Sequence, residues 1–214
     1  MRRIIFLLPL LLIQACGSGI RIGPLTDDVV FIGDSVTQIW GNQAAFQANK
    51  KWIDKGIAGQ TSGAIAARFE SDVIFLHPGT VHIIAGTNDV YPGWVLCKGG
   101  NRNTCSNMQS MVETAKHYGI RVVIGTIPPW GCADDPICGL SAADETAARY
   151  ERIAQLNMWL KTFAAEEGVT LVDYHAALTN AEGLHYAEGL TTDGVHPTPA
   201  GYAVMQPLVV SDLP

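Results

Sequence analysis

The order of apolar and polar residues along the chain predicts strands that alternate with helices. Residues 29–32 are apolar without alternation, which is typical of a strand buried on both faces of a parallel sheet. Four more strands are expected over residues 52–57, 81–85, 120–127 and 169–172. Apolar residues at helical spacing predict helices over residues 36–46, 64–75, 108–118, 144–167 and 199–210. This alternation predicts an α/β fold with a parallel, doubly wound sheet and right-handed crossovers.

Small and polar residues follow the carboxyl ends of these strands. Gly33, Asp34 and Ser35 follow the first strand, and residues 56–61, 86–89 and 192–197 follow later ones. Ligand sites in such sheets lie beyond the carboxyl edge, so the sequence predicts a site there. Ser35 also opens a helix, whose free N–H groups favour negative charge. Taken alone, a turn with an N-cap serine is the simpler interpretation.

Five residues at this edge have the groups that acyl transfer from an ester requires. The reaction needs a nucleophile, a base, an acid that orients the base, and donors for the oxyanion. We expect Ser35 to be the nucleophile, His196 its base and Asp193 the orienting acid, because Asp193 lies only three residues before His196. The Ser35 and Gly59 backbone N–H groups and the Asn88 side-chain amide would form the oxyanion hole.

Length, composition and charge exclude several classes of protein. A chain of 214 residues with 48% hydrophobic and 16% charged residues fits one compact domain rather than a disordered chain. A net charge of −6 with 14 Lys and Arg offers no basic stripe, so we expect no nucleic-acid partner. The sequence has no Gly-x-Ser-x-Gly, His-Glu-x-x-His or P-loop motif and no zinc-type cysteine spacing. We therefore expect neither a metal nor another cofactor, and the oligomeric state is left open.

The N-terminus predicts export. Arg2 and Arg3 precede an apolar run over residues 4–13 that is too short to span a bilayer and has the length of a signal peptide. We expect a signal peptide over residues 1–15, a tether over residues 16–26 and a single domain over residues 27–214.

The end of the apolar run also predicts a membrane anchor. The sequence IQAC over residues 13–16 resembles the lipobox of bacterial lipoproteins, although Ile stands where Leu is usual, and Cys16 would carry the lipid. The expected location is then the periplasm or the cell surface, on a membrane. Cleavage after Ala15 by an ordinary signal peptidase, which would give a secreted soluble protein, is the alternative.

The other four cysteines lie in two close couples. Cys97 and Cys105 bracket one short loop of turn-forming residues, and Cys132 and Cys138 bracket another. In an oxidising compartment, two local disulfides are the simplest of the three pairings. Four reduced thiols are the alternative.

Three further residues are candidates for substrate contact. Trp94 and Trp130 follow the third and fourth strands and would line the acyl or alcohol pocket, although packing at the rim explains them equally well. His185 lies in the loop that leads to Asp193. We interpret Asp34 and Asp89 as turn and hydrogen-bonding residues, and the remaining histidines outside the triad as structural or exposed.

These motifs resemble those of the SGNH, or GDSL, hydrolase family. The four blocks of that family match Gly33-Asp34-Ser35, Gly59, Gly86-x-Asn88-Asp89 and Asp193-x-x-His196, in the same order. The resemblance implies a flavodoxin-like three-layer α/β/α sandwich, with a five-stranded parallel sheet in the order 2-1-3-4-5. It also implies hydrolysis through an acyl-serine. By this resemblance the expected catalytic and oxyanion-hole residues are Ser35, Gly59, Asn88, Asp193 and His196. Val36 stands where many members have Leu or Ile, which changes packing more than chemistry.

The combined hypothesis is a metal-independent serine esterase for short acyl esters, with acetyl the favoured acyl group. The chain is too short for a large inserted lid, which favours small substrates. Within the family, a lysophospholipase, a thioesterase or a carbohydrate O-deacetylase are alternatives. An acyltransferase and a non-catalytic surface binding module are more distant ones.

Overall fold

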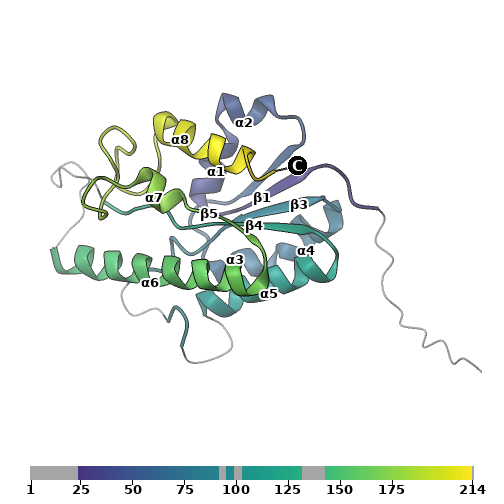
Figure 1. Ribbon diagram of the computed structural model, residues 1–214, viewed down its shortest axis with the longest axis horizontal. Coiled ribbons are helices and arrows are strands. Elements are labelled where there is room, and N and C mark those ends of the chain that lie inside the picture. The colour runs from purple at the N-terminus through teal and green to yellow at the C-terminus, as the bar shows by residue number, and fades with distance from the viewer. Residues whose placement is uncertain (1–23, 92–94, 99–102, 132–142, 214) are drawn as a thin grey trace, which may run out of the picture.

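A five-stranded parallel sheet lies between two layers of helices in the computed structural model (Figure 1). The structure describes residues 24–91, 95–98, 103–131 and 143–213, and only the backbone of residues 143–147. The predicted signal peptide and residues 16–23 of the predicted tether lie outside this range. Among the described helices, none combines the length and the apolar character needed to cross a bilayer.

The sheet confirms the predicted fold class and strand order. Its strands are β1 (Val29–Gly33), β2 (Trp52–Gly56), β3 (Thr80–Ile84), β4 (Arg121–Gly125) and β5 (Thr170–Val172). All neighbours pair in parallel in the order β2-β1-β3-β4-β5. The carboxyl ends of β1 and β3 are therefore adjacent in the middle of the sheet, where the predicted site residues begin.

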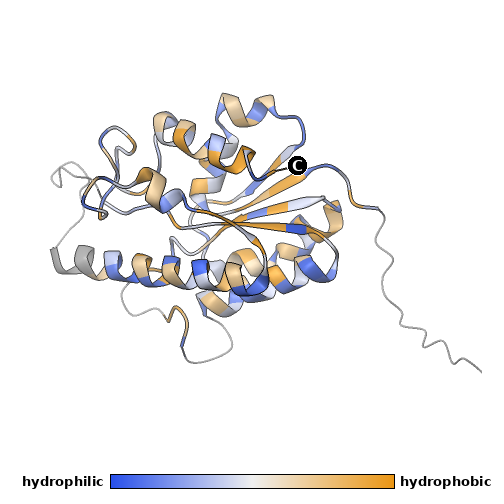
Figure 2. Cartoon of the chain, in the orientation of Figure 1, coloured by the Kyte–Doolittle hydropathy of each residue, from blue (hydrophilic) through white to orange (hydrophobic). Residues whose placement is uncertain are grey.

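The helices cover both faces of the sheet (Figure 1). One layer contains α1 (Ser35–Gly41), α2 (Ala44–Ala48), α7 (Tyr174–Leu178) and α8 (Pro199–Val210). The other contains α3 (Ser62–Ala67), α4 (Phe69–Asp72), the 3-10 turn η1 (Ile74–Leu76), α5 (Thr104–His117) and α6 (Ala143–Glu167). Apolar residues run along the strands between the two layers (Figure 2).

Two predicted continuous helices were wrong, because the backbone turns within them. The helix expected over residues 36–46 ends at Gly41, and extended Gln43 starts a separate helix, α2. The helix expected over residues 64–75 divides into α3, α4 and η1, because Arg68 and Val73 leave helical geometry. Apolar spacing continues across such breaks, so the pattern alone does not locate them.

Two other helices also differ from the expectation. Helix α5 starts at Thr104, four residues before the predicted start, because Asn103 and Ser106 form a reciprocal capping box. Helix α7 was not predicted, and its five residues are too few to give a periodic pattern.

The core under α1, α2 and α8 is built around Phe31 of β1. Its ring is fully buried, and its centroid lies 5.5 Å from that of Trp40, 4.9 Å from Phe46 and 4.7 Å from Trp52. These aromatic contacts fix the strand that leads directly into Ser35.

Replacing Phe31 by alanine should lower the free energy of unfolding by about 3–5 kcal/mol, since the cavity would be lined by rings that cannot collapse into it. Phe75, which is 64% exposed, provides a matched control. Phe75→Ala should change the free energy of unfolding by about 0.5 kcal/mol or less. Urea denaturation measures this quantity for both variants. Equal losses for the two variants would contradict the role given to Phe31.

A buried histidine lies in the central strand β3. His82 is fully buried, and its Nε2 is 2.9 Å from the Tyr174 hydroxyl oxygen. Burial lowers the pKa of His82 to about 3, from an ordinary value of 6.5. The folded protein therefore keeps this ring neutral at pH values where the unfolded chain would protonate it.

His82→Gln removes this titration and should make folding less sensitive to mild acid. As pH falls below 6.5, the unfolded state of the wild type takes up a proton that the folded state takes up only near pH 3. Between pH 6.5 and 5, the wild type should thus lose about 2 kcal/mol of unfolding free energy relative to the variant. A difference that stays constant with pH, measured by urea denaturation, would refute this.

Candidate active site

Ser35 is the first residue of α1, directly beyond the carboxyl end of β1. Asp34 caps this helix, since its Oδ1 accepts the Val36 N–H at 2.9 Å. The Tyr202 hydroxyl of α8 donates to the Val36 carbonyl oxygen at 2.8 Å and ties the same turn to the helix above it. Ser35 is 8% exposed, so its position is set by packing from several elements.

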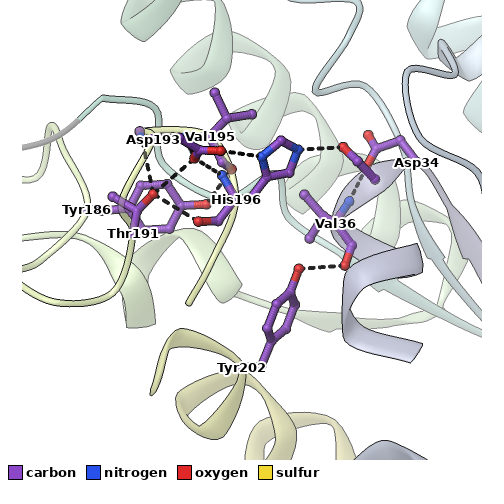
Figure 3. Close-up of polar contacts among 10 residues, drawn as sticks. Asp34, Val36, Tyr186, Thr191, Asp193, Val195, His196 and Tyr202 are labelled. Carbon is purple, nitrogen blue, oxygen red and sulfur yellow. Dashed lines mark hydrogen bonds and ion pairs between the residues drawn. The ribbon is translucent and has the colours of Figure 1, made fainter. Parts of the chain in front are cut away.

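The structure brings three of the predicted residues into a chain of hydrogen bonds. His196 Nε2 lies 2.9 Å from Ser35 Oγ, and His196 Nδ1 lies 2.6 Å from Asp193 Oδ2. Figure 3 shows the imidazole ring between Asp193 and the start of α1. Ser35 and His196 are 161 residues apart in sequence, so the fold alone makes this contact.

The second oxygen of Asp193 is held by its own loop. Oδ1 accepts the N–H groups of Val195 at 2.9 Å and His196 at 2.8 Å. Burial acts to raise the pKa of Asp193, but the hydrogen bonds from the His196 ring and from these two backbone groups outweigh it, and the pKa lies below 3.8. An ionised Asp193 accepts a hydrogen bond from the His196 Nδ1–H group, which leaves Nε2 free to accept the Ser35 hydroxyl proton.

Hydrogen bonds from outside the turn hold the loop around Asp193 and His196. The Thr191 hydroxyl donates to the His196 carbonyl oxygen at 2.9 Å, and the Tyr186 hydroxyl donates to that of Val195 at 2.9 Å (Figure 3). The Gly131 N–H, beyond β4, donates to the Gly194 carbonyl oxygen at 2.7 Å. The base is thus fixed against the same sheet that carries the nucleophile.

The three predicted oxyanion donors come from the ends of β1, β2 and β3. The Asn88 amide donates one N–H to the Gln60 carbonyl oxygen at 3.0 Å, which leaves its second N–H available. Gly59, just before Gln60, has φ +76°, a conformation that favours glycine, and nothing lies within 4 Å of a Cβ placed there. The Ser35 N–H, in the first turn of α1, is not used by the helix.

Sequence reasoning missed Arg68, which connects two of these segments. Its Nη2 donates to the Gly33 carbonyl oxygen at 2.9 Å, and its Nε donates to Gln60 Oε1 at 2.6 Å. Its Nη1 pairs with Asp72 at 2.7 Å, and the side chain is 14% exposed. Arg68 therefore clamps the end of β1 to the loop that carries Gly59. No local motif marks it, because its partner at the end of β1 is 35 residues away in sequence.

Two buried carboxylates support the site without belonging to the hydrogen-bonded chain. Burial raises the pKa of Asp34 to about 6, although its hydrogen bond from Val36 acts in the opposite direction. Asp89 accepts the Ser62 N–H at 2.9 Å and the Thr104 hydroxyl at 3.0 Å, and so joins β3 to α3 and α5. Both are hydrogen-bonding residues, as expected.

Of the three candidates for substrate contact, the structure describes two. Trp130 is 4% exposed and lines a mainly apolar cavity of about 200 Å³ with Tyr150, His175 and Leu184, among others. The ring of His185 lies beside this cavity, with Nδ1 2.6 Å from the Tyr150 hydroxyl. Neither described side chain forms a hydrogen bond with Ser35, His196 or Asp193. Trp94 lies outside the described residues.

The cysteines are described only in part. The sulfurs of Cys97 and Cys105 lie at disulfide distance, with Cα atoms 5.0 Å apart, as one of the two local pairings requires. Cys16, Cys132 and Cys138 lie outside the described residues. In the described part of the chain, no group of three or more His, Cys, Asp and Glu side chains could hold a metal ion.

Comparison with known proteins identifies the family. The model of the GDSL-like lipase/acylhydrolase family matches residues 31–204. An acetylxylan esterase of Geobacillus stearothermophilus is 28% identical over 160 residues, which cover 72% of this chain and 67% of the relative.

Two solved structures share most of the fold. A GDSL-like lipase from Bacteroides thetaiotaomicron VPI-5482 is 30% identical, with a TM-score of 0.74 and 87% of each chain covered. A protein from Bacteroides fragilis NCTC 9343 is 33% identical, with a TM-score of 0.74 and 90% of each chain covered. Because the family model spans most of the sequence and the sheet order agrees, this chain belongs to the GDSL-like lipase/acylhydrolase family and is a carboxylic ester hydrolase.

Proposed function

We propose that this protein is a serine esterase that removes short acyl groups, acetyl above all, through an acyl-serine intermediate. The observation that carries the proposal is the continuous chain of hydrogen bonds from Ser35 through His196 to Asp193. It contains a nucleophile, a base and an orienting acid in the order that acyl transfer requires.

In the acylation step, Ser35 Oγ attacks the ester carbonyl carbon and its proton moves to His196 Nε2. The carbonyl oxygen becomes an oxyanion, which would accept hydrogen bonds from the Ser35 and Gly59 N–H groups and from the Asn88 amide. His196 then gives its proton to the departing alkoxide, and Asp193 stabilises the imidazolium in the meantime.

Deacylation repeats these roles with water as the nucleophile. His196 removes a proton from water, the hydroxide attacks the acyl-serine carbonyl, and the carboxylic acid leaves as the proton returns to Ser35. Apart from the ester and water, the groups that act in these steps are all residues of this chain.

Acetyl esters of carbohydrates are the favoured substrates among those that the family admits. The relative that is named an acetylxylan esterase supports this choice, at 28% identity. Lysophospholipase, thioesterase and acyltransferase activities remain outcomes of the substrate test.

We also propose that the enzyme is exported and anchored by a lipid on Cys16. The basic residues before the apolar run and the lipobox-like sequence that ends it support this location. The Cys97 and Cys105 sulfurs at disulfide distance suit an oxidising compartment.

Ser35→Ala should lower kcat for p-nitrophenyl acetate by about 10⁴-fold or more, because it removes the nucleophile. The wild type should hydrolyse the acetate and butyrate esters and lose activity steeply on longer chains, up to the palmitate. Ser211→Ala, an exposed serine at the end of α8, should leave all rates unchanged.

Full activity of the Ser35→Ala protein would overturn the assignment of the nucleophile. Sustained wild-type activity on the palmitate ester would instead overturn the preference for short acyl groups and favour a lysophospholipase or thioesterase.

A further inference from the structure

Arg149, in α6, is a buried cation without an anionic partner in the described part of the chain. The residue is 9% exposed, and its Nη1 is buried without any hydrogen-bond partner. Leaving such a donor unpaired costs free energy, and this cost is recovered when a ligand accepts the hydrogen bond. The other described arginines are Arg68, Arg121 and Arg152, and none of them has a buried nitrogen without a hydrogen-bond partner.

Two aromatic rings form a corner around the Arg149 guanidinium. Its Cζ lies 3.7 Å from the centroid of the Tyr91 ring and 4.5 Å from that of Trp130. The two rings are inclined at 77°, so they cover two sides of the guanidinium. Neither ring covers its remaining edge. Cation–π contacts of this kind hold the charge in place without neutralising it.

The corner lies at the carboxyl edge of the sheet, where Ser35 also lies. Tyr91 follows Asn88 by three residues, beyond the carboxyl end of β3. Trp130 precedes Gly131, whose N–H donates to the Gly194 carbonyl oxygen in the loop between Asp193 and His196. Since β3 is the neighbour of both β1 and β4, the corner is at the same sheet edge as Ser35.

The accessibility of the two rings indicates the direction of approach. Tyr91 is 40% exposed, whereas Trp130 is 4% exposed. Trp130 therefore forms the inner wall of the corner and Tyr91 the outer one. A ligand would reach Arg149 from the Tyr91 side of the corner.

We propose that Arg149 binds a carboxylate that the ester substrate carries, so that the enzyme selects acyl esters of acidic compounds. A guanidinium matches a carboxylate by two parallel N–H···O bonds, and the apolar corner would strengthen them by excluding water. This inference rests on the proposed esterase function and deepens it, because it names an anionic group as a determinant of substrate choice.

The test compares matched esters with and without a carboxylate. One pair is 4-acetoxybenzoate and its methyl ester, with the carboxylate in the leaving group. The other is mono-4-nitrophenyl succinate and its methyl ester, with the carboxylate in the acyl group. The readout is the ratio of kcat/KM for the acid to kcat/KM for its neutral partner, because a loss of packing alone would lower both.

Arg149→Met should lower this ratio by about 10- to 100-fold for at least one pair, as expected for a lost charge-assisted hydrogen bond. Arg149→Lys should restore part of it, since the charge remains. Arg121→Met provides a control, because Arg121 is exposed at the amino end of β4, at the opposite edge of the sheet, and should leave both ratios unchanged. Unchanged ratios for Arg149→Met in both pairs would overturn the proposal.

A binding measurement separates this proposal from the esterase function. Calorimetry with benzoate and the Ser35→Ala protein requires no turnover. Saturable binding that the Ser35→Ala, Arg149→Met double variant loses would support the carboxylate site, even if the wild type hydrolysed no ester. Failure of benzoate and succinate to bind the Ser35→Ala protein would overturn it.

Discussion

The packing at Gly33 is the constraint on which the rest of the site depends. A Cβ at this position would lie 2.5 Å from the Ile84 carbonyl oxygen, so only glycine lets β1 and β3 end this closely together. The Gly33 carbonyl oxygen accepts the Ile57 N–H at 3.1 Å and Arg68 Nη2 at 2.9 Å. The strand end that delivers Ser35 is thus also the point where the loop after β2 and the Arg68 side chain are attached.

Hydrogen bonds from other segments also explain how the base can come from a distant loop. The segment with Asp193 and His196 has little regular structure, yet its carbonyl oxygens accept hydrogen bonds from Thr191, Tyr186 and Gly131. These bonds replace the order that a helix or strand would supply. Trp130, one residue before Gly131, contacts the Arg149 guanidinium through its ring. The segment of Trp130 and Gly131 therefore supports both the loop of the base and the proposed carboxylate contact.

The sequence predicted the sheet and the chain of Ser35, His196 and Asp193 because both depend on local signals. Buried parallel strands appear as short apolar runs, and polar residues after them meet at one edge whatever the details of packing. The breaks at Gly41 and Arg68 were not predicted, because apolar spacing continues across them. Arg68 and Arg149 were missed because neither lies in a motif. The contacts of Arg68 with Gly33, and of Arg149 with Tyr91 and Trp130, join segments that are distant in sequence and form only in the fold.

In the proposed mechanism, Ser35 is the reactive nucleophile of the enzyme. Treatment with diethyl 4-nitrophenyl phosphate, followed by peptide mapping by mass spectrometry, tests it directly, because an activated serine displaces 4-nitrophenolate from this reagent and keeps the diethylphosphoryl group. We expect a single diethylphosphoryl group, on the peptide that contains Ser35, and loss of esterase activity in proportion to the labelling. Complete inactivation with the label on another residue, or full labelling of Ser35 with activity intact, would contradict it.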